Sequence, residues 1–182
     1  MSLVVNLYSG PGGGKSTTAA LLFGALKQRN INVELVTEYV KSWAYEKRPI
    51  GAYDQFYFLG KQIRRESLLY GKVDVIITDS PVLMGSLYAY KYSPLSVAEG
   101  VRSAIMAFYR QSAADGHQHV HVMLNRSYPY QTSGRYESEN EAKQIDQDIK
   151  SLLKQIKFPF IEHDRLVDDL DTLIQNVMSE TT

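Results

Sequence analysis

Short apolar runs alternate with longer stretches of helical character along the chain, and this alternation predicts the fold. The apolar runs predict strands at 3–8, 33–37, 73–78, 120–124 and 160–163. The stretches between them predict helices at 15–29, 53–70, 94–114, 138–156 and 166–178. Strands that alternate with helices of this length usually pair in parallel, with both faces of the sheet covered. We therefore expect an α/β protein with a five-stranded parallel sheet and helices on both faces.

The chain has 182 residues, which is the size of one domain, and no repeat or linker divides it. We expect a single domain over 1–182 with a lid-like loop at about 125–137. The net charge is zero and there is no cysteine, which argues against a global attraction to nucleic acid or membrane and excludes disulfides and thiolate metal sites. No apolar run approaches membrane-spanning length, and the first predicted strand leaves no room for a signal peptide. A cytoplasmic location fits this composition.

The stretch after the first predicted strand has the pattern of a phosphate-binding loop. It reads Ser9-Gly10-Pro11-Gly12-Gly13-Gly14-Lys15-Ser16-Thr17 and leads directly into a predicted helix. Such a loop curls so that its N–H groups and the helix N-terminus face one anionic group. We expect residues 10–17 to bind ATP, with Lys15 reaching the β- and γ-phosphates and the Ser16 hydroxyl ligating Mg²⁺.

One position departs from the G-x-x-x-x-G-K-[ST] pattern. The first glycine would stand where this chain has Ser9, and we expect Gly10 to take up the strained backbone geometry in its place. The alternative is a glycine-rich turn with a chance lysine. The strand before the loop, the helix after it and the register of Gly14-Lys15-Ser16 favour the P-loop.

Two acids stand at predicted strand ends, where open parallel sheets bind their ligands. Asp79 ends the run Val73–Thr78 like a Walker B acid, and can hold Mg²⁺ through water or accept a proton. Glu38 ends the second strand and can deprotonate an acceptor hydroxyl. The alternatives are a turn-capping aspartate before Pro81 and a glutamate at a helix start. Spacing leaves open which of the two acids is the base.

A polar loop follows the fourth predicted strand and contains Arg126 and Arg135. A long polar loop in a compact domain is often functional, and a closing lid can bring arginines to a migrating phosphoryl group. We expect both arginines to be catalytic, the alternative being a solvated loop with two ordinary arginines. The run Ser138-Glu139-Asn140-Glu141 then reads as a capping box that starts the next helix.

Aromatic and basic residues gather between the second and third predicted strands. Aromatic rings can stack on a nucleobase and arginines can hold phosphates, so the set as a whole predicts an acceptor pocket beside Glu38, although for any single ring we favour a place in the core. The set comprises Trp43, Tyr45, Lys47, Arg48, Tyr53, Phe56, Tyr57, Phe58, Lys61, Arg64 and Arg65.

Three histidines alternate at 117, 119 and 121, which places them on one face of a strand. Without cysteine they do not form a typical metal-ligand set. We interpret them as the polar beginning of the fourth strand.

These motifs together resemble a P-loop kinase of the nucleoside and nucleotide kinase type. Glu38 followed by Trp43 resembles the E-x-x-x-x-W of deoxynucleoside kinases, in which the glutamate acts as base. Two positions differ, because those enzymes carry Pro after the glutamate and Arg after the strand-three acid, where this chain has Tyr39 and Ser80. The resemblance implies the nucleoside monophosphate kinase fold, with strand order 2-3-1-4-5.

Two further stretches are similar to small P-loop proteins of bacteriophages. They are Asp79-Ser80-Pro81 and Gly134-Arg135-Tyr136-x-x-Glu139-x-Glu141-Ala142. Such proteins are likened to nicotinamide riboside kinase domains, and some of the wider group are similar to kinases that phosphorylate 5-hydroxymethyluridine in phage DNA. The resemblance implies the host cytoplasm as location and a hydroxymethylated DNA base as one possible acceptor.

The sequence thus predicts an ATP- and Mg²⁺-dependent phosphotransferase whose acceptor is a hydroxyl on a nucleoside, a nucleotide or a base in DNA. One rival is an NTP-hydrolysing switch or ATPase subunit, against which stands the absence of a long partner-binding extension. A second rival is a DNA-binding module that uses ATP structurally, which zero net charge disfavours. The oligomeric state is left open.

Overall fold

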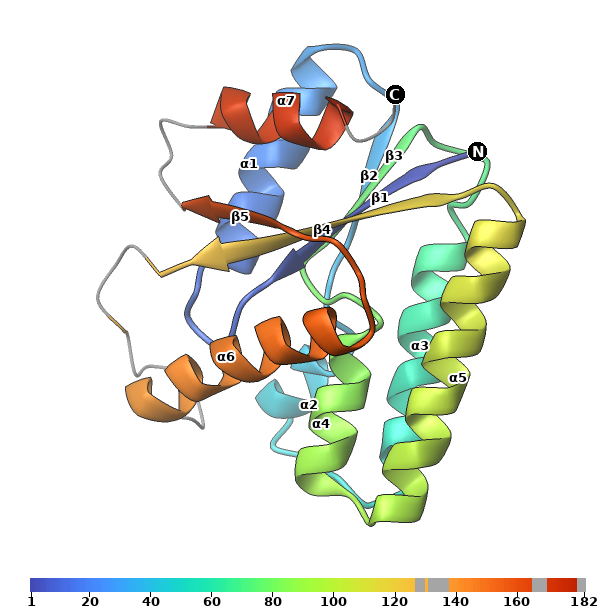
Figure 1. Cartoon of the computed structure of the whole chain (residues 1–182), viewed down its shortest axis with the longest axis vertical. Coiled ribbons are helices and arrows are strands. Elements are labelled where there is room, and N and C mark those ends of the chain that lie inside the picture. Colours follow the sequence, from blue (N-terminus) through green and yellow to red (C-terminus); the bar gives the residue numbers. More distant parts are fainter. Residues whose placement is uncertain (127–129, 131–137, 165–169, 180–182) are drawn as a thin grey trace.

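The computed structural model describes residues 1–126, 130, 138–164 and 170–179, and these form an α/β fold around one parallel sheet (Figure 1). The strands are β1 (Leu3–Tyr8), β2 (Val33–Val36), β3 (Val75–Thr78), β4 (Gln118–Asn125) and β5 (Ile161–Asp164). They lie in the order β2-β3-β1-β4-β5, and every neighbouring pair is parallel. The predicted fold class and strand order are confirmed.

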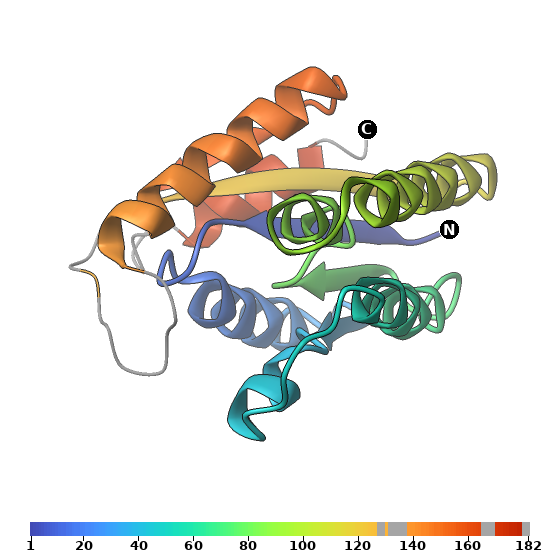
Figure 2. The same ribbon diagram turned by 90° about the horizontal axis from the view of Figure 1, so that it is seen from below.

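Seven helices are present in the described part of the chain and cover both faces of the sheet. They are α1 (Lys15–Gln28), α2 (Lys41–Tyr45), α3 (Asp54–Ser67), α4 (Met84–Tyr92), α5 (Leu95–Ala114), α6 (Glu139–Gln155) and α7 (Leu170–Ser179). Figure 1 shows α1 and α7 on one side of the sheet and α3 to α6 on the other. Seen from below, α6 lies on the β4–β5 side of the sheet and α2 on the β2 side (Figure 2).

The two faces follow from the period of two along β1, whose six residues are all buried. Leu3, Val5 and Leu7 pack with apolar side chains of α1 and α7. Tyr8 packs on the opposite face with side chains of α4, α5 and α6. The central strand is therefore buried on both sides, as expected for a parallel sheet covered on both faces.

Two details differ from the expectation, one is confirmed and one stays untested. The helix α2 is an addition that the sequence pattern did not predict, and β3 begins at Val75 rather than at Val73. The capping box of α6 is confirmed: the Ser138 hydroxyl accepts from the Glu141 N–H at 3.3 Å, and the Ser138 N–H donates to the Glu141 carboxylate at 2.7 Å. The lid-like loop lies almost entirely outside the described residues, so the lid stays a prediction. No helix in the described ranges is long and apolar enough to cross a membrane.

The alternating histidines of β4 belong to a polar layer between the sheet and helices α3 and α5. The Nδ1 atom of His121 lies 2.9 Å from the Tyr8 hydroxyl, and the Nε2 atom of His119 lies 2.8 Å from the Ser112 hydroxyl. Burial lowers the pKa of His119 to about 4 and that of His121 to about 3, so both rings are neutral at pH 7. They are internal hydrogen-bonding residues, rather than only the polar beginning of a strand.

Glu66 lies fully buried in the same layer. The Tyr70 hydroxyl donates to its Oε1 atom at 2.7 Å, while Oε2 has no hydrogen-bond partner among the described residues. Burial raises the pKa of this carboxyl group to about 7, from an ordinary value of 4.5. The folded protein therefore keeps a proton on Glu66 at pH values where the unfolded chain has released it.

We expect Glu66→Gln to stabilise the protein at pH 8 and to change its stability little at pH 5. Between about pH 4.5 and pH 7, Glu66 is ionised in the unfolded chain and must take up a proton when the chain folds. The wild type therefore loses about 2–4 kcal/mol of stability from this group as the pH rises through that range. Glutamine has no charge at either pH. Urea unfolding of both proteins across this range measures the difference, with the exposed Glu99→Gln as control. A Glu66→Gln effect that is constant with pH would contradict the assignment.

Candidate functional site

The P-loop follows β1 and ends at Gly14, which is the N-cap of α1 with φ of 91°. Gly12 also has a positive φ, of 76°. Glycine adopts this backbone conformation without steric cost, which accounts for both residues. The φ of Gly10 lies outside the left-handed region, so the prediction that Gly10 takes the strained geometry is wrong.

Gly10 is required for a different reason, which is close approach of the loop to α6. A Cβ atom at this position would lie 2.5 Å from the carbonyl oxygen of Ala142 and 2.8 Å from a terminal nitrogen of Arg126. Both distances are shorter than any normal contact. Only glycine therefore allows the loop backbone to touch the helix.

The Ser9 side chain fills space that the next glycines leave open. Ser9 is fully buried, and a Cβ atom on Gly13 would lie 2.3 Å from its Oγ atom. The serine at the motif's first position is thus accommodated by the glycine four residues later. This is the physical reason that the chain can depart from the usual pattern and still form the loop.

Lys15 begins α1 and turns its side chain back over the loop. Its Nζ atom donates to the carbonyl oxygen of Ser9 at 2.6 Å. Burial lowers the pKa of Lys15, while the carboxylates of Glu38, Asp79 and Asp146 act in the opposite direction and favour the charged ammonium group. The two acids predicted from strand ends therefore lie close enough to Lys15 to act on its charge.

Ser16 and Asp79 form a hydrogen-bonded pair beside the loop. The Ser16 hydroxyl donates to Oδ2 of Asp79 at 2.6 Å. Asp79 is only 8% exposed, and its Oδ1 atom is buried without a hydrogen-bond partner in the described ranges. Mg²⁺ prefers hard oxygen ligands and usually takes few of them from the protein. This hydroxyl and carboxylate, with one carboxylate oxygen not otherwise engaged by the protein, fit that ion.

Glu38 is held next to α3 by the backbone on either side of it. The N–H of Tyr39 donates to Oε1 of Gln62 at 3.2 Å, and a terminal nitrogen of Arg65 donates to the carbonyl oxygen of Thr37 at 3.1 Å. These bonds fix the chain that leaves β2. They place Glu38 at the same edge of the sheet as Asp79, since β2 and β3 are parallel neighbours.

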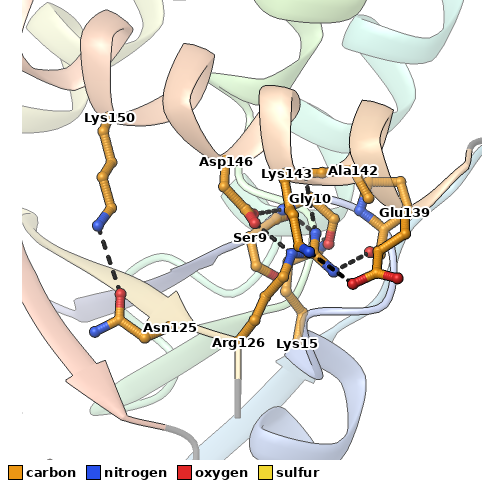
Figure 3. Close-up of polar contacts among 11 residues, drawn as sticks. Ser9, Gly10, Lys15, Asn125, Arg126, Glu139, Ala142, Lys143, Asp146 and Lys150 are labelled. Carbon is orange, nitrogen blue, oxygen red and sulfur yellow. Dashed lines mark hydrogen bonds and ion pairs between the residues drawn. The ribbon is translucent and has the colours of Figure 1, made fainter. Parts of the chain in front are cut away.

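Arg126 follows β4 and contacts both the P-loop and α6 (Figure 3). Its Nε atom donates to Asp146 Oδ2, one terminal nitrogen donates to the carbonyl oxygen of Pro11 at 2.8 Å, and the other donates to that of Ala142 at 3.0 Å. The predicted contact of Arg126 with a phosphoryl group stays a proposal. Arg135 lies outside the described residues.

Asp146 is a site residue that the motifs did not reveal. Its Oδ1 atom accepts from the Gly10 N–H at 2.5 Å, and its Oδ2 atom accepts from Arg126. The available signal was its position on α6, where it lies on the face that buries Ala142, Ile145 and Ile149. An acid on the apolar face of a helix needs a partner.

None of the residues in the aromatic and basic segment is buried, so the interpretation of its single rings as core residues is wrong. Trp43 and Phe58 are half-buried, whereas Tyr45 and Tyr53 are 78% and 79% exposed. The Trp43 ring meets Phe58 edge to face, with centroids 4.8 Å apart. We call the surface formed by Tyr39, Trp43, Tyr45, Tyr53, Tyr57 and Phe58 the α2–α3 aromatic surface. Three cations lie over its rings, at 4.9–5.3 Å from the centroids: Arg48 over Trp43, Lys61 over Tyr57 and Arg65 over Tyr39.

Solved structures share this fold. The structure of NadR protein in complex with NR has a TM-score of 0.71 and 16% identity, covering 96% of this chain and 51% of NadR. NadR in complex with NAD and AMP-PNP has the same TM-score and identity. The Mycobacterium tuberculosis APS kinase CysC, in complex with AMPPNP and APS, has a TM-score of 0.54 and 12% identity, with 98% of each chain covered. The chain thus spans about half the length of NadR.

A search of curated proteins finds no match to the sequence. The family model described as AAA domain matches residues 4–166, which include the P-loop, both strand-end acids and Asp146. That match covers far more than half of the chain, and the chain belongs to the AAA domain family.

Proposed function

We propose that this protein is an ATP- and Mg²⁺-dependent kinase that transfers the γ-phosphoryl group to a hydroxyl of a nucleoside-type acceptor. The observation that carries the proposal is the Ser16–Asp79 pair beside Lys15, at the carboxyl edge of the sheet. In a kinase of this kind the protein mainly positions the reactants and stabilises charge. The site combines a phosphate-binding loop, a fitting pair of Mg²⁺ ligands and a second carboxylate at the adjacent strand end.

Each residue then has a defined role. Residues 10–17 hold the triphosphate, and Lys15 moves from the Ser9 carbonyl to the β- and γ-phosphate oxygens, because an anionic oxygen is the stronger acceptor. Ser16 and Asp79 hold Mg²⁺, which when bound neutralises charge on the phosphate oxygens. Because Asp79 is assigned to Mg²⁺ together with Ser16, we assign the general base to Glu38. Arg135 and Arg126 are proposed to stabilise the transferred group.

The α2–α3 aromatic surface supports an acceptor that carries an aromatic base. It follows Glu38 directly in the chain, and its exposed rings and covering cations suit stacking and phosphate contact. NadR, which has the same fold, was solved in complex with NR. A free nucleoside, a nucleotide and a hydroxymethylated base in DNA all fit this chemistry. The last would have to leave the stacked duplex before reaction.

We expect labelled phosphate from γ-³²P-ATP to reach a nucleoside-type acceptor in the presence of Mg²⁺. The acceptor panel comprises free nucleosides, mononucleotides, and DNA with and without 5-hydroxymethyluracil, analysed by thin-layer chromatography and gel electrophoresis. Lys15→Ala protein provides the background. Label found only in inorganic phosphate would contradict the kinase and favour an NTP-hydrolysing switch.

A further inference from the structure

We infer that Asp146 is a positioning residue that holds the P-loop in its nucleotide-binding shape through Gly10 and Arg126. The inference rests on the proposed function, because it concerns how the same site binds ATP. Asp146 is 8% exposed, and both of its carboxylate oxygens are used, one by the Gly10 N–H and the other by Arg126. The residue comes from α6, far along the chain from the loop (Figure 3).

Gly10 connects Asp146 to the rest of the loop through contacts of its own carbonyl group. Its carbonyl oxygen accepts from the Gly13 N–H at 3.2 Å and lies 3.4 Å from Nζ of Lys15. The peptide groups of Gly10 are thus fixed on one side by Asp146 and on the other by the turn that presents Gly13 and Lys15. A substitution of Asp146 should therefore alter the positions of the groups that are proposed to bind phosphate.

Arg126 adds a second restraint and balances the charge. It joins the Asp146 carboxylate to the carbonyl oxygen of Pro11, the next residue of the loop. The side chains of Arg126 and Asp146 are largely buried, with 15% and 11% of their side-chain surface exposed, respectively. Without Arg126, a carboxylate so close to the loop would repel the triphosphate.

Charge and position predict opposite effects of removing the carboxylate. If Asp146 acted on ATP only through its negative charge, Asp146→Asn and Asp146→Ala would bind the anionic nucleotide more tightly. If Asp146 positions the loop, both variants bind it more weakly, because nucleotide binding must then order a loop that the wild type holds ready. The sign of the change distinguishes the two explanations.

We expect Asp146→Ala to raise the dissociation constant of Mg²⁺–AMP-PNP at least tenfold, measured by isothermal titration calorimetry on the full chain. Asp146→Asn keeps the Oδ1 acceptor for Gly10 but cannot pair with Arg126, so a smaller increase of about threefold to tenfold is expected. In steady-state assays the KM for ATP rises in parallel, and kcat at saturating ATP falls by a smaller factor than KM rises, since Arg126 also loses a partner. Asp148→Asn is the matched control, since Asp148 is an exposed residue of α6 that accepts from Gln144.

Each outcome has a distinct meaning. Equal or tighter AMP-PNP binding by folded Asp146 variants would overturn the inference, and so would a fall in kcat with unchanged affinity. Failure of the wild type itself to bind AMP-PNP would instead overturn the proposed function. Thermal unfolding of each variant separates loss of affinity from loss of folding. If Asp146→Ala does not fold, the isosteric Asp146→Asn carries the test.

Discussion

Lys15→Ala is expected to lower the rate of phosphoryl transfer by about 10³-fold or more, because it removes the ammonium group that is proposed to contact the β- and γ-phosphates. Lys15 lies half-buried at the start of α1, and its Nζ atom is held over the loop by the Ser9 carbonyl. When ATP binds, this ammonium group can stabilise the negative charge that develops on the oxygen between the β- and γ-phosphorus atoms during transfer. A neutral methyl group cannot.

The fold should survive this change. Burial disfavours the charged form of Lys15, and this cost offsets much of the hydrogen bond to Ser9 and the attraction to nearby carboxylates that the alanine variant loses. Circular dichroism and thermal unfolding check this point, and a coupled assay or labelled ATP measures the rate. Lys27→Ala is the matched control on the same helix, since Lys27 makes an exposed ion pair with Glu34. Turnover at the wild-type rate by Lys15→Ala would remove the P-loop from the mechanism.

Asp79→Asn and Glu38→Gln are each expected to lower kcat by roughly 10²-fold or more, for different reasons. Asp79 is proposed to hold Mg²⁺ together with Ser16, so its loss should also raise the Mg²⁺ concentration needed for half-maximal activity. Glu38 is proposed to take the proton of the acceptor hydroxyl, so its loss should leave the Mg²⁺ requirement unchanged. Magnesium titrations at saturating ATP separate the two roles.

The matched control for Asp79 is Asp74→Asn. Asp74 is exposed and immediately precedes β3, whereas Asp79 immediately follows it. Asparagine is almost isosteric with aspartate, and glutamine with glutamate, so these substitutions change the packing very little. If kcat stays near the wild-type value in both Asp79→Asn and Glu38→Gln, the assignment of these acids to catalysis is wrong. If only the Mg²⁺ dependence fails to separate them, the roles are exchanged or shared.

The sequence allowed the sheet to be predicted because its strands are short runs rich in apolar residues and are separated by helices. The order of the strands came only from the family resemblance, since pairing depends on contacts that no local pattern encodes. The helix α2 has five residues, too few for a helical period to be recognised. The buried roles of His119 and Glu66 were likewise hidden, because a polar residue shows its burial only once its partners are placed.

The site was predictable where one segment contains the chemistry. Residues 9–17 and the two strand-end acids could be named, because parallel strands end at one edge and the motif fixes the register. Asp146 could be singled out as an acid on an apolar helix face, but its partners Gly10 and Arg126 lie in other segments. The need for glycine at position 10 arises from contact with α6, which the loop sequence does not reveal.

The packing of Ser9 against Gly13 bears on how such loops are found by pattern matching. Most of these motifs have glycine, and so no side chain, at their first position. In this chain the side chain is missing four residues later instead, so only one of the two positions needs to be glycine. A pattern that demands glycine at the first position discards this chain. One that accepts a small side chain there whenever the fifth position is glycine retains it, and directed libraries of this loop should vary the two codons together.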